Sequence, residues 1–185
     1  MLTKETLKSP KNFAENLTKT IEISEDSIEI HYKLGKIIGI GHYGTVKEAW
    51  SLKEPPTYVA IKILDLDQIE KTFKSICCEV SSLRQANHEN IIKIHQVFMD
   101  KKHLYLILDF IEGVDLSDYI CELGGLEETK SKYILLQILK TINYLHSIHI
   151  CHRDIKLDNI MINQETLEIK LIDFGFATEF SEKEC

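Results

Sequence analysis

The chain has 185 residues, which suits one domain of ordinary size or a large part of a bigger one. It is 44% hydrophobic and 28% charged, with 8 Gly and 3 Pro, so its composition is that of a globular protein. A formal net charge of −7 without a basic block argues against a nucleic-acid partner. No apolar run approaches the roughly 18 residues that a membrane span needs, so we expect no membrane partner.

The N-terminal end of the chain has the character of a flexible leader. Residues 1–31 are rich in Lys, Glu, Thr and Ser and show no regular apolar period. They also lack the apolar core of a secretory signal, and the 5 cysteines have no paired spacing. We therefore expect a reduced, cytoplasmic protein, with the nucleus also open. Ser9, which precedes Pro10, could accept phosphate, but this dipeptide is more often only a loop.

From Tyr32 onward the pattern changes to short apolar segments bounded by Gly and Pro, which predicts strands. These strands are expected over residues 32–41, 45–52, 57–64, 91–100 and 103–111. Between the third and fourth, residues 68–86 repeat apolar side chains every three or four positions, which predicts an amphipathic helix. The apolar positions of this helix are Ile69, Phe73, Ile76, Val80 and Leu83.

After Gly113 the sequence becomes mainly helical. Helices are expected over 115–123 and 126–148, followed by short strands over 159–163 and 168–174. Strands first and helices second indicate an α+β protein with two unlike lobes. We place an N-lobe at residues 32–112 and a partial C-lobe at residues 113–185.

The segment "GIGHYGTV" contains Gly39, Gly41 and Gly44 in a G-x-G-x-x-G-x-V pattern. Glycines of this kind let a backbone approach phosphates closely, although a plain hairpin turn would use them as well. Dinucleotide-binding proteins have similar spacing, but there a helix follows the glycines. Here the β-branched pair Thr45–Val46 predicts a strand instead.

The segment "VAIK" places Lys62 among apolar residues of a strand. A lysine on a buried face needs an anionic partner, and Glu79 on the following helix is a candidate for that partner. The alternative is an edge-strand lysine whose charged end reaches water.

The segment "CHRDIKLDNIMI" alternates polar and aliphatic residues in an unusual way. Asp154 could accept a proton or orient a hydroxyl, and Lys156 could neutralise a phosphate. Asn159 and Asp173 offer the hard oxygen ligands that Mg²⁺ prefers. Each residue alone has an ordinary structural explanation, such as a helix cap or a loop acid.

Taken together, these motifs resemble the eukaryotic protein kinases from about Tyr32 to the end of the chain. The ordered set "GIGHYGTV", "VAIK", Glu79, "HRDIKLDN" and "DFG" is far more specific than any of its parts. The resemblance implies that Asp154 is the catalytic base, that Lys62 pairs with Glu79 and holds the ATP phosphates, and that Lys156 takes part in transfer. It also implies ATP and Mg²⁺ as cofactors, the metal being bound by Asn159 and Asp173.

The resemblance further assigns a set of nucleotide contacts in the glycine loop, around the adenine ring and near the ribose. They are Gly39, Ile40, Gly41, Gly44, Val46, Ala60, Lys62, Leu108, Asp109, Ile111, Asp115 and Met161. It likewise implies a stacked apolar spine of Leu83, Ile94, His152 and Phe174.

The lysine in "HRDIKLDN" resembles the serine/threonine type, and "DFGFATEF" resembles the calmodulin-dependent and Snf1-like branch. We therefore expect a protein substrate with a Ser or Thr acceptor. Arg153, directly before the proposed base, suggests regulation by a phosphate that an upstream activating kinase adds. We expect that phosphosite beyond Cys185 rather than at Thr178 or Ser181.

Two features leave alternatives open. No "APE" follows "DFG", so we expect a chain truncated within the activation segment, and an ATP-binding fragment without catalysis is the alternative function. A cluster of His and Cys could suggest zinc, although no matching second ligand group occurs elsewhere. The cluster consists of His146, His149, Cys151 and His152. The neighbouring pair Cys77–Cys78 is more consistent with small core residues than with a redox switch.

Overall fold

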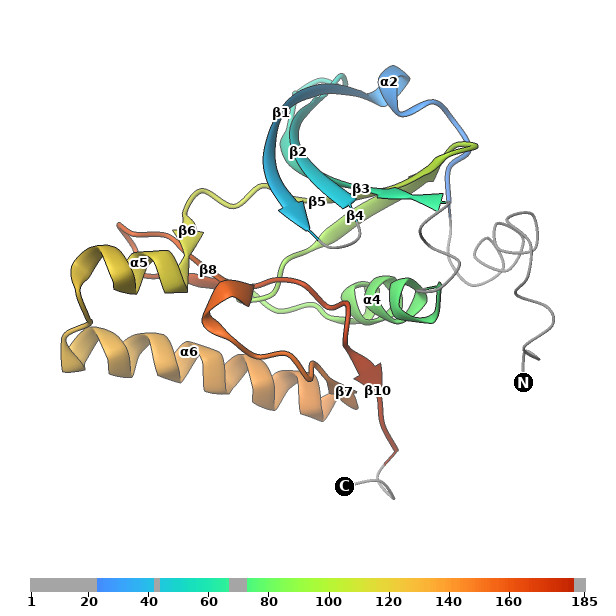
Figure 1. Ribbon diagram of the computed structural model, residues 1–185. Coiled ribbons are helices and arrows are strands. Elements are labelled where there is room, and N and C mark those ends of the chain that lie inside the picture. Colours follow the sequence, from blue (N-terminus) through green and yellow to red (C-terminus); the bar gives the residue numbers. More distant parts are fainter. Residues whose placement is uncertain (1–22, 42–43, 67–72, 182–185) are drawn as a thin grey trace. The chain divides into compact units, whose positions relative to one another are not determined.

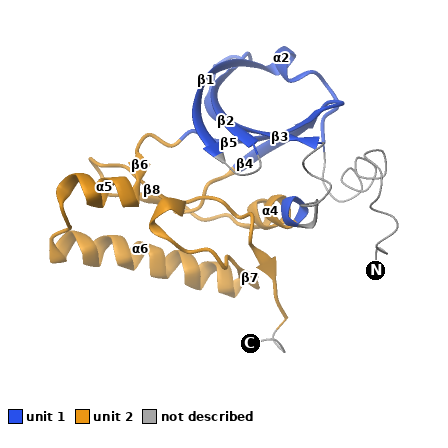
Figure 2. Ribbon diagram, in the orientation of Figure 1, with its two compact units in different colours: residues 1–77, 94–110 blue, residues 78–93, 111–185 orange. Residues whose placement is uncertain are grey.

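A computed structural model describes residues 23–41, 44–66 and 73–181 of the chain (Figure 1). The chain divides into two compact units (Figure 2). Unit 1 comprises residues 1–77 and 94–110, and unit 2 comprises residues 78–93 and 111–185. This division differs from the expected lobes, because residues 78–93 belong with unit 2 although they precede the last two strands of unit 1.

Unit 1 is built on a five-stranded antiparallel sheet in the order β1-β2-β3-β5-β4. The strands are β1 (Tyr32–Gly41), β2 (Gly44–Ser51), β3 (Tyr58–Asp65), β4 (Ile94–Met99) and β5 (His103–Asp109). All five predicted strands are confirmed, with ends shifted by up to three residues. β5 has a continuous run of buried side chains, which suits a strand that lies between two others.

The core of unit 1 includes residues that we expected to be flexible. Ile28, in the short helix α2 (Ile28–His31), is only 6% exposed and packs in the cluster that contains Phe98. Ser24 forms an isolated parallel bridge with Phe98, in which its N–H donates to Val97 O over 3.0 Å. The prediction of a leader up to residue 31 was therefore wrong for residues 23–31, because Ile28 buries apolar surface there. Residues 1–22 lie outside the described part of the chain.

Unit 2 combines helices with very short strands. Its helices are the C-terminal part of α4 (Phe73–Gln85), α5 (Leu116–Leu123) and α6 (Glu128–Ser147). A three-stranded sheet joins β6 (Val114–Asp115), β8 (Ile160–Ile162) and β9 (Ile169–Leu171), while β7 (Ile150–Cys151) pairs with β10 (Thr178–Glu179). The two-residue strands β6, β7 and β10 have no readable sequence pattern, and we did not predict them.

Local chemistry explains where α5 begins and ends. The Asp115 carboxylate accepts a hydrogen bond from the Asp118 N–H over 2.8 Å, which caps the first turn of the helix. Gly124 ends the helix in a left-handed conformation with φ of 67°, which glycine adopts without strain. Asp115 thus has a structural task in addition to its predicted position near a ribose.

Helix α4 begins at Phe73 in the described residues, so Ile69 lies outside them. Three of the predicted core positions, Ile76, Val80 and Leu83, are at most 3% exposed, which confirms the expected apolar face. On α6, Ile134 and Leu145 are buried, whereas Leu135, Leu136 and Leu139 are about half exposed. None of the helices in the described residues is long and apolar enough to cross a membrane.

We expect Phe98→Ala to lower the free energy of unfolding by about 3–5 kcal/mol. Phe98 is 1% exposed and contacts the rings of His31 and Tyr32, at centroid distances of 5.1 and 6.0 Å. Chemical denaturation measures the change, with Leu52→Ala as the control because Leu52 is 55% exposed. Equal losses in the two variants would contradict the core assignment.

Candidate functional site

The glycine-rich segment forms the end of the β1–β2 hairpin. Gly39 lies opposite Val46, Ile40 opposite Thr45, and Gly41 opposite Gly44, while residues 42–43 lie outside the described part. A strand, not a helix, follows the glycines, as the β-branched pair predicted, which excludes the dinucleotide-binding alternative.

The glycines of this hairpin meet different constraints. A Cβ at Gly44 would lie 1.9 Å from the carbonyl oxygen of Ile63, so the close approach of β2 to β3 requires glycine there. At Gly39 a Cβ would meet only the Val46 side chain, at an ordinary 3.7 Å. Ile40 is 82% exposed, so its side chain adds nothing to the core of unit 1. Packing therefore requires glycine at position 44 but does not require it at position 39.

Four other predicted residues of unit 1, on three neighbouring strands, share one face of the sheet. Val46 lies opposite Lys62, and Ala60 lies opposite Leu108. Because side chains two positions apart on a strand point the same way, Ala60 and Lys62 are on the same side of β3. β3 lies between β2 and β5, so Lys62 is on an interior strand and the edge-strand alternative is wrong.

The end of β5 carries a polar pair. The Asp109 carboxylate accepts a hydrogen bond of 2.8 Å from His95 Nε2. The side chain of Asp109 therefore has a partner, so the predicted contact with adenine would fall to its backbone. Leu108, the residue before it, is 7% exposed.

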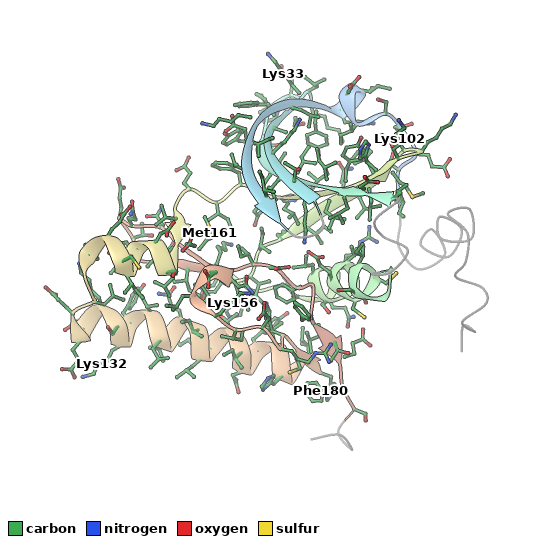
Figure 3. The ribbon with its side chains drawn as sticks, viewed as in Figure 1. Lys33, Lys102, Lys132, Lys156, Met161 and Phe180 are labelled. Atoms are coloured by element: carbon green, nitrogen blue, oxygen red, sulfur yellow. The ribbon has the colours of Figure 1, made fainter. Side chains whose placement is uncertain are left out.

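In unit 2 three polar side chains of the "HRDIKLDN" segment meet. The Lys156 ammonium lies 3.0 Å from Asp154 Oδ2, and Asn159 Nδ2 donates to the same oxygen over 2.8 Å. Asn159 Nδ2 also donates to the backbone oxygen of Asp154 over 2.9 Å. Figure 3 labels Lys156, and Met161 lies on β8 a few residues further along the chain. The segment thus holds a carboxylate between an ammonium group and an amide.

These contacts set the charge of Asp154. The hydrogen bond from Lys156 lowers the pKa of the Asp154 carboxyl, and the bond from Asn159 lowers it further. The same pair raises the pKa of Lys156. Near neutral pH the site therefore holds a carboxylate and an ammonium ion, with one face of Asp154 open because its side chain is 26% exposed.

His152 joins this segment to the one that carries Asp173. Its Nδ1 accepts from the Asp154 N–H over 3.3 Å, so its Nε2 carries the proton and donates to Ile172 O over 3.2 Å. Its ring meets the fully buried ring of Phe174 edge to face, at a centroid distance of 4.7 Å. Burial lowers the pKa of His152, which keeps the imidazole neutral near pH 7.

Asp173 has an unusual backbone conformation. Its φ of 56° lies in the left-handed region, which non-glycine residues seldom adopt without support from their surroundings. That support comes from the Ile172 N–H, which donates to Asn159 O over 2.9 Å, and from the Gly175 N–H, which donates to Asp173 Oδ1 over 3.3 Å. Asp173 directly follows Ile172, a residue whose backbone is hydrogen-bonded to Asn159.

The donor set of Asn159 and Asp173 fits a magnesium ion. Asn159 is 5% exposed and uses its amide N–H₂ group on Asp154, which leaves its carbonyl oxygen for another partner. Asp173 supplies a carboxylate. One amide oxygen, one carboxylate and the oxygens of a phosphate ligand are hard donors that suit Mg²⁺.

The remaining predicted residues of unit 2 lie on three elements. Asp115 on β6 is paired with Met161 on β8, and Ile111 lies in the segment just before β6. Glu79 lies on α4 and is 4% exposed. A carboxylate buried to this degree requires a polar or charged partner. The structure therefore divides the predicted site residues into two groups, one in each unit.

The structure does not support the zinc alternative for the His and Cys residues between 146 and 152. His146 and His149 both lie edge-on to the ring of Phe180, whereas His152 faces Phe174. Within the described ranges, no three His, Cys, Asp or Glu side chains gather as ligands would. Aromatic contacts account for these histidines instead.

Arg153 is hydrogen-bonded to the segment that follows Asp173. Its backbone φ is 65°, and its Nε donates to Phe176 O over 2.8 Å, so part of the guanidinium already has a partner. This bond ties the proposed base to the segment that follows Asp173. The rest of the side chain is exposed and can still meet a phosphate.

Two residues that position the site, Asn90 and Gln137, were not predicted from the sequence. Asn90 donates through its side chain to Ile169 O over 2.9 Å and to Gln137 Oε1 over 3.1 Å, and its own backbone oxygen accepts from the Leu171 N–H. Gln137 in turn donates to Leu167 O over 2.9 Å. These bonds fix β9, which leads directly to Asp173. The sequence gives no signal for them, because a lone Asn in a loop and a Gln on a helix have no distinguishing pattern.

We expect Lys156→Met to raise the pKa of Asp154 toward the usual range of a carboxyl group, because the main cause of its lowering is removed. A carboxyl NMR titration measures this shift. The control is Lys132→Met, which removes an exposed ammonium that lies 2.6 Å from Glu128 instead. An unchanged pKa of Asp154 in the Lys156 variant would contradict the pairing.

Comparison with known proteins adds independent evidence. Residues 32–185 match the protein kinase domain family. The chain is 32% identical over 158 residues to the serine/threonine-protein kinase DCLK3 of Mus musculus, an alignment that covers 84% of this chain and 20% of that protein. It is 35% identical over 147 residues to the serine/threonine-protein kinase SIK1 of Mus musculus, with 79% of this chain and 19% of that protein covered.

The human DCLK3 protein gives a similar result, 30% identity over 154 residues, with 82% of this chain and 24% of that protein covered. The chain thus spans about a fifth of the length of the curated relatives it matches. The family match nevertheless includes every predicted site residue, from the glycine hairpin to Asp173. The chain therefore belongs to the protein kinase domain family.

Proposed function

We propose that the protein is a serine/threonine protein kinase that transfers the γ-phosphoryl group of ATP to a Ser or Thr hydroxyl of a protein substrate. The observation that carries this proposal is the cluster in which Lys156 and Asn159 hold the Asp154 carboxylate. Such a carboxylate is ionised at neutral pH and can orient an acceptor hydroxyl and take its proton. The names of the relatives, all serine/threonine-protein kinases, support the choice of acceptor.

In this proposal the residues of the cluster have distinct tasks. Asp154 accepts the proton of the attacking hydroxyl, and Lys156 neutralises charge on the phosphoryl group as it moves. Asn159 and Asp173 would hold Mg²⁺, which neutralises phosphate charge when it is bound. His152 keeps both segments in place through its two hydrogen bonds.

The residues of unit 1 would bind the nucleotide. Gly39 and Gly41 leave the backbone of the hairpin open toward the phosphates, and Lys62 would hold the α- and β-phosphates with Glu79 as its acidic partner. The apolar contacts to adenine would come from Val46, Ala60, Leu108 and Met161, with backbone groups of Asp109 and Ile111, and Asp115 would lie near the ribose. The exposed Ile40 would lie over the phosphates.

An upstream activating kinase and a cytoplasmic location complete the proposal. Arg153 offers an exposed guanidinium beside the base, which suits a regulatory phosphate. The described cysteines, Cys77, Cys78, Cys121 and Cys151, are not joined in disulfide bonds, which agrees with a reducing compartment.

We expect Asp154→Asn to lower phosphoryl transfer by about 10²–10⁴-fold while ATP binding persists, because the amide keeps the shape but cannot take a proton. Asp173→Asn should instead weaken magnesium-dependent ATP binding. Transfer to a generic Ser/Thr peptide and calorimetric titration with ATP and Mg²⁺ measure the two effects. Equal loss of nucleotide binding in both variants would reverse the assigned roles, and binding without transfer in the wild type would favour a non-catalytic nucleotide-binding module.

We expect millimolar ATP with Mg²⁺ to raise the melting temperature of the wild type, since a ligand that binds only the folded state stabilises it by about 2.7 kcal/mol at a hundredfold excess over Kd. Lys62→Met should remove most of this increase. Lys33→Met is the control, because Lys33 is an exposed lysine of the same sheet, on β1. A wild-type melting temperature that the nucleotide leaves unchanged would contradict the proposal.

A further inference from the structure

A polar link joins helix α4 to the strand that follows "DFG". Gln85 Nε2 donates to Glu179 Oε1 over 2.6 Å, and the Ser81 hydroxyl donates to the same oxygen over 3.5 Å. Gln85 Nε2 also lies 3.1 Å from Ser81 Oγ, so the three side chains form one network. All three residues belong to unit 2 (Figure 2).

On the strand side of the link, little freedom remains between Asp173 and Glu179. The Ala177 N–H donates to Phe174 O over 2.9 Å, which closes a turn, and Thr178 and Glu179 pair with β7. The Phe180 N–H continues this pairing with a bond of 3.0 Å to His149 O, and Figure 3 labels its ring at the end of the strand. Glu179 is therefore joined to Asp173 through six positions of chain that contain a hydrogen-bonded turn and a paired strand.

On the helix side, the link begins close to the buried acid of α4. Ser81 and Gln85 are one helical turn apart, and Glu79 precedes Gln85 by six positions, about 9 Å along the axis at 1.5 Å per residue. Because a hydrogen-bonded helix moves as one body over this length, the position of Gln85 and that of Glu79 change together.

We propose that Gln85 and Glu179 are a positioning pair that keeps the helix carrying Glu79 and the segment carrying Asp173 at a constant separation. This inference rests on the proposed function, in which Asp173 binds the metal that accompanies ATP. Neither side chain touches the reacting atoms. The pair acts through Asp173, so it supports the magnesium-dependent part of nucleotide binding.

The chemistry of the pair allows a test by exchange. Gln85→Glu places a second carboxylate against Glu179 and removes the donor. The double variant Gln85→Glu/Glu179→Gln restores one donor and one acceptor in reverse order, and the Ser81 hydroxyl can serve either arrangement. The control is Glu165→Gln, which changes an exposed acid in the turn between β8 and β9.

Two quantities are measured for the wild type and for each variant of the full chain. The first is calorimetric titration with ATP, carried out with and without MgCl₂. The ratio of the two Kd values gives the magnesium-dependent gain in affinity. The second is hydrogen exchange at the amides of residues 176–180 without nucleotide. We expect Gln85→Glu to reduce the gain by about three- to tenfold, the scale of one lost hydrogen bond of ordinary strength. It should also speed exchange, the double variant should restore both readouts, and Glu165→Gln should change neither.

A double variant that behaves like Gln85→Glu alone would overturn the inference, and so would a gain that Gln85→Glu leaves intact. Failure of the proposed function gives a different result. In that case the wild type would show no magnesium-dependent gain at all, while exchange at residues 176–180 would still respond to the variants. The positioning role would then fall with the function, although the link itself would remain.

Discussion

A buried neutral histidine is the constraint on which the candidate site of unit 2 depends. His152 accepts from the backbone of Asp154, donates to the carbonyl of Ile172 and packs against Phe174. One side chain therefore fixes both the segment with the proposed base and the segment with the proposed metal ligand. Burial keeps the imidazole uncharged, and only the neutral ring can accept and donate at the same time.

The polar groups around this histidine are arranged so that each has a defined charge and partner. Lys156 and Asn159 converge on one oxygen of Asp154, which lowers the pKa of its carboxyl, and the Asp154 side chain remains 26% exposed. Phosphoryl transfer depends mainly on positioning and on stabilisation of charge. A carboxylate held by two donors at an exposed face of the unit meets both requirements, and the polar link between Gln85 and Glu179 adds a support further along the same segment.

In unit 1, ordinary strand pairing places four of the predicted nucleotide contacts on one face of the sheet. Lys62 lies on an interior strand, where its charge is costly unless an anion meets it. The glycine hairpin approaches β3 so closely that Gly44 permits no side chain, whereas Gly39 has room for one. Packing therefore does not require glycine at position 39, which agrees with the proposed role of this hairpin in binding.

The sequence by itself determined the element types and the residues of the candidate site. Alternating or continuous apolar runs identified the strands of unit 1, and the three-to-four-residue period identified α4 and α6, because these patterns are local. Short motifs around Lys62, Asp154 and Asp173 predicted the chemistry for the same reason. The prediction of a flexible leader was wrong at residues 23–31. There a single apolar residue, Ile28, packs into the core of unit 1, and the polar sequence around it gives no sign of this.

Only the tertiary structure decided how these groups are held. The bonds of Asn90 to Gln137 and Ile169 span 47 and 79 positions, and the bond of Gln85 to Glu179 spans 94. Polar side chains that meet across such separations follow no periodic pattern, since their partners are set by the path of the chain through space. The burial that keeps His152 neutral and the bond from Arg153 to Phe176 O likewise depend on segments brought together by the fold, whereas the lowered pKa of Asp154 comes from its near neighbours Lys156 and Asn159 once the chain orients them. Local sequence motifs are therefore enough to predict which residues form the site. The charge states of these residues and the bonds that hold them arise only when the chain folds.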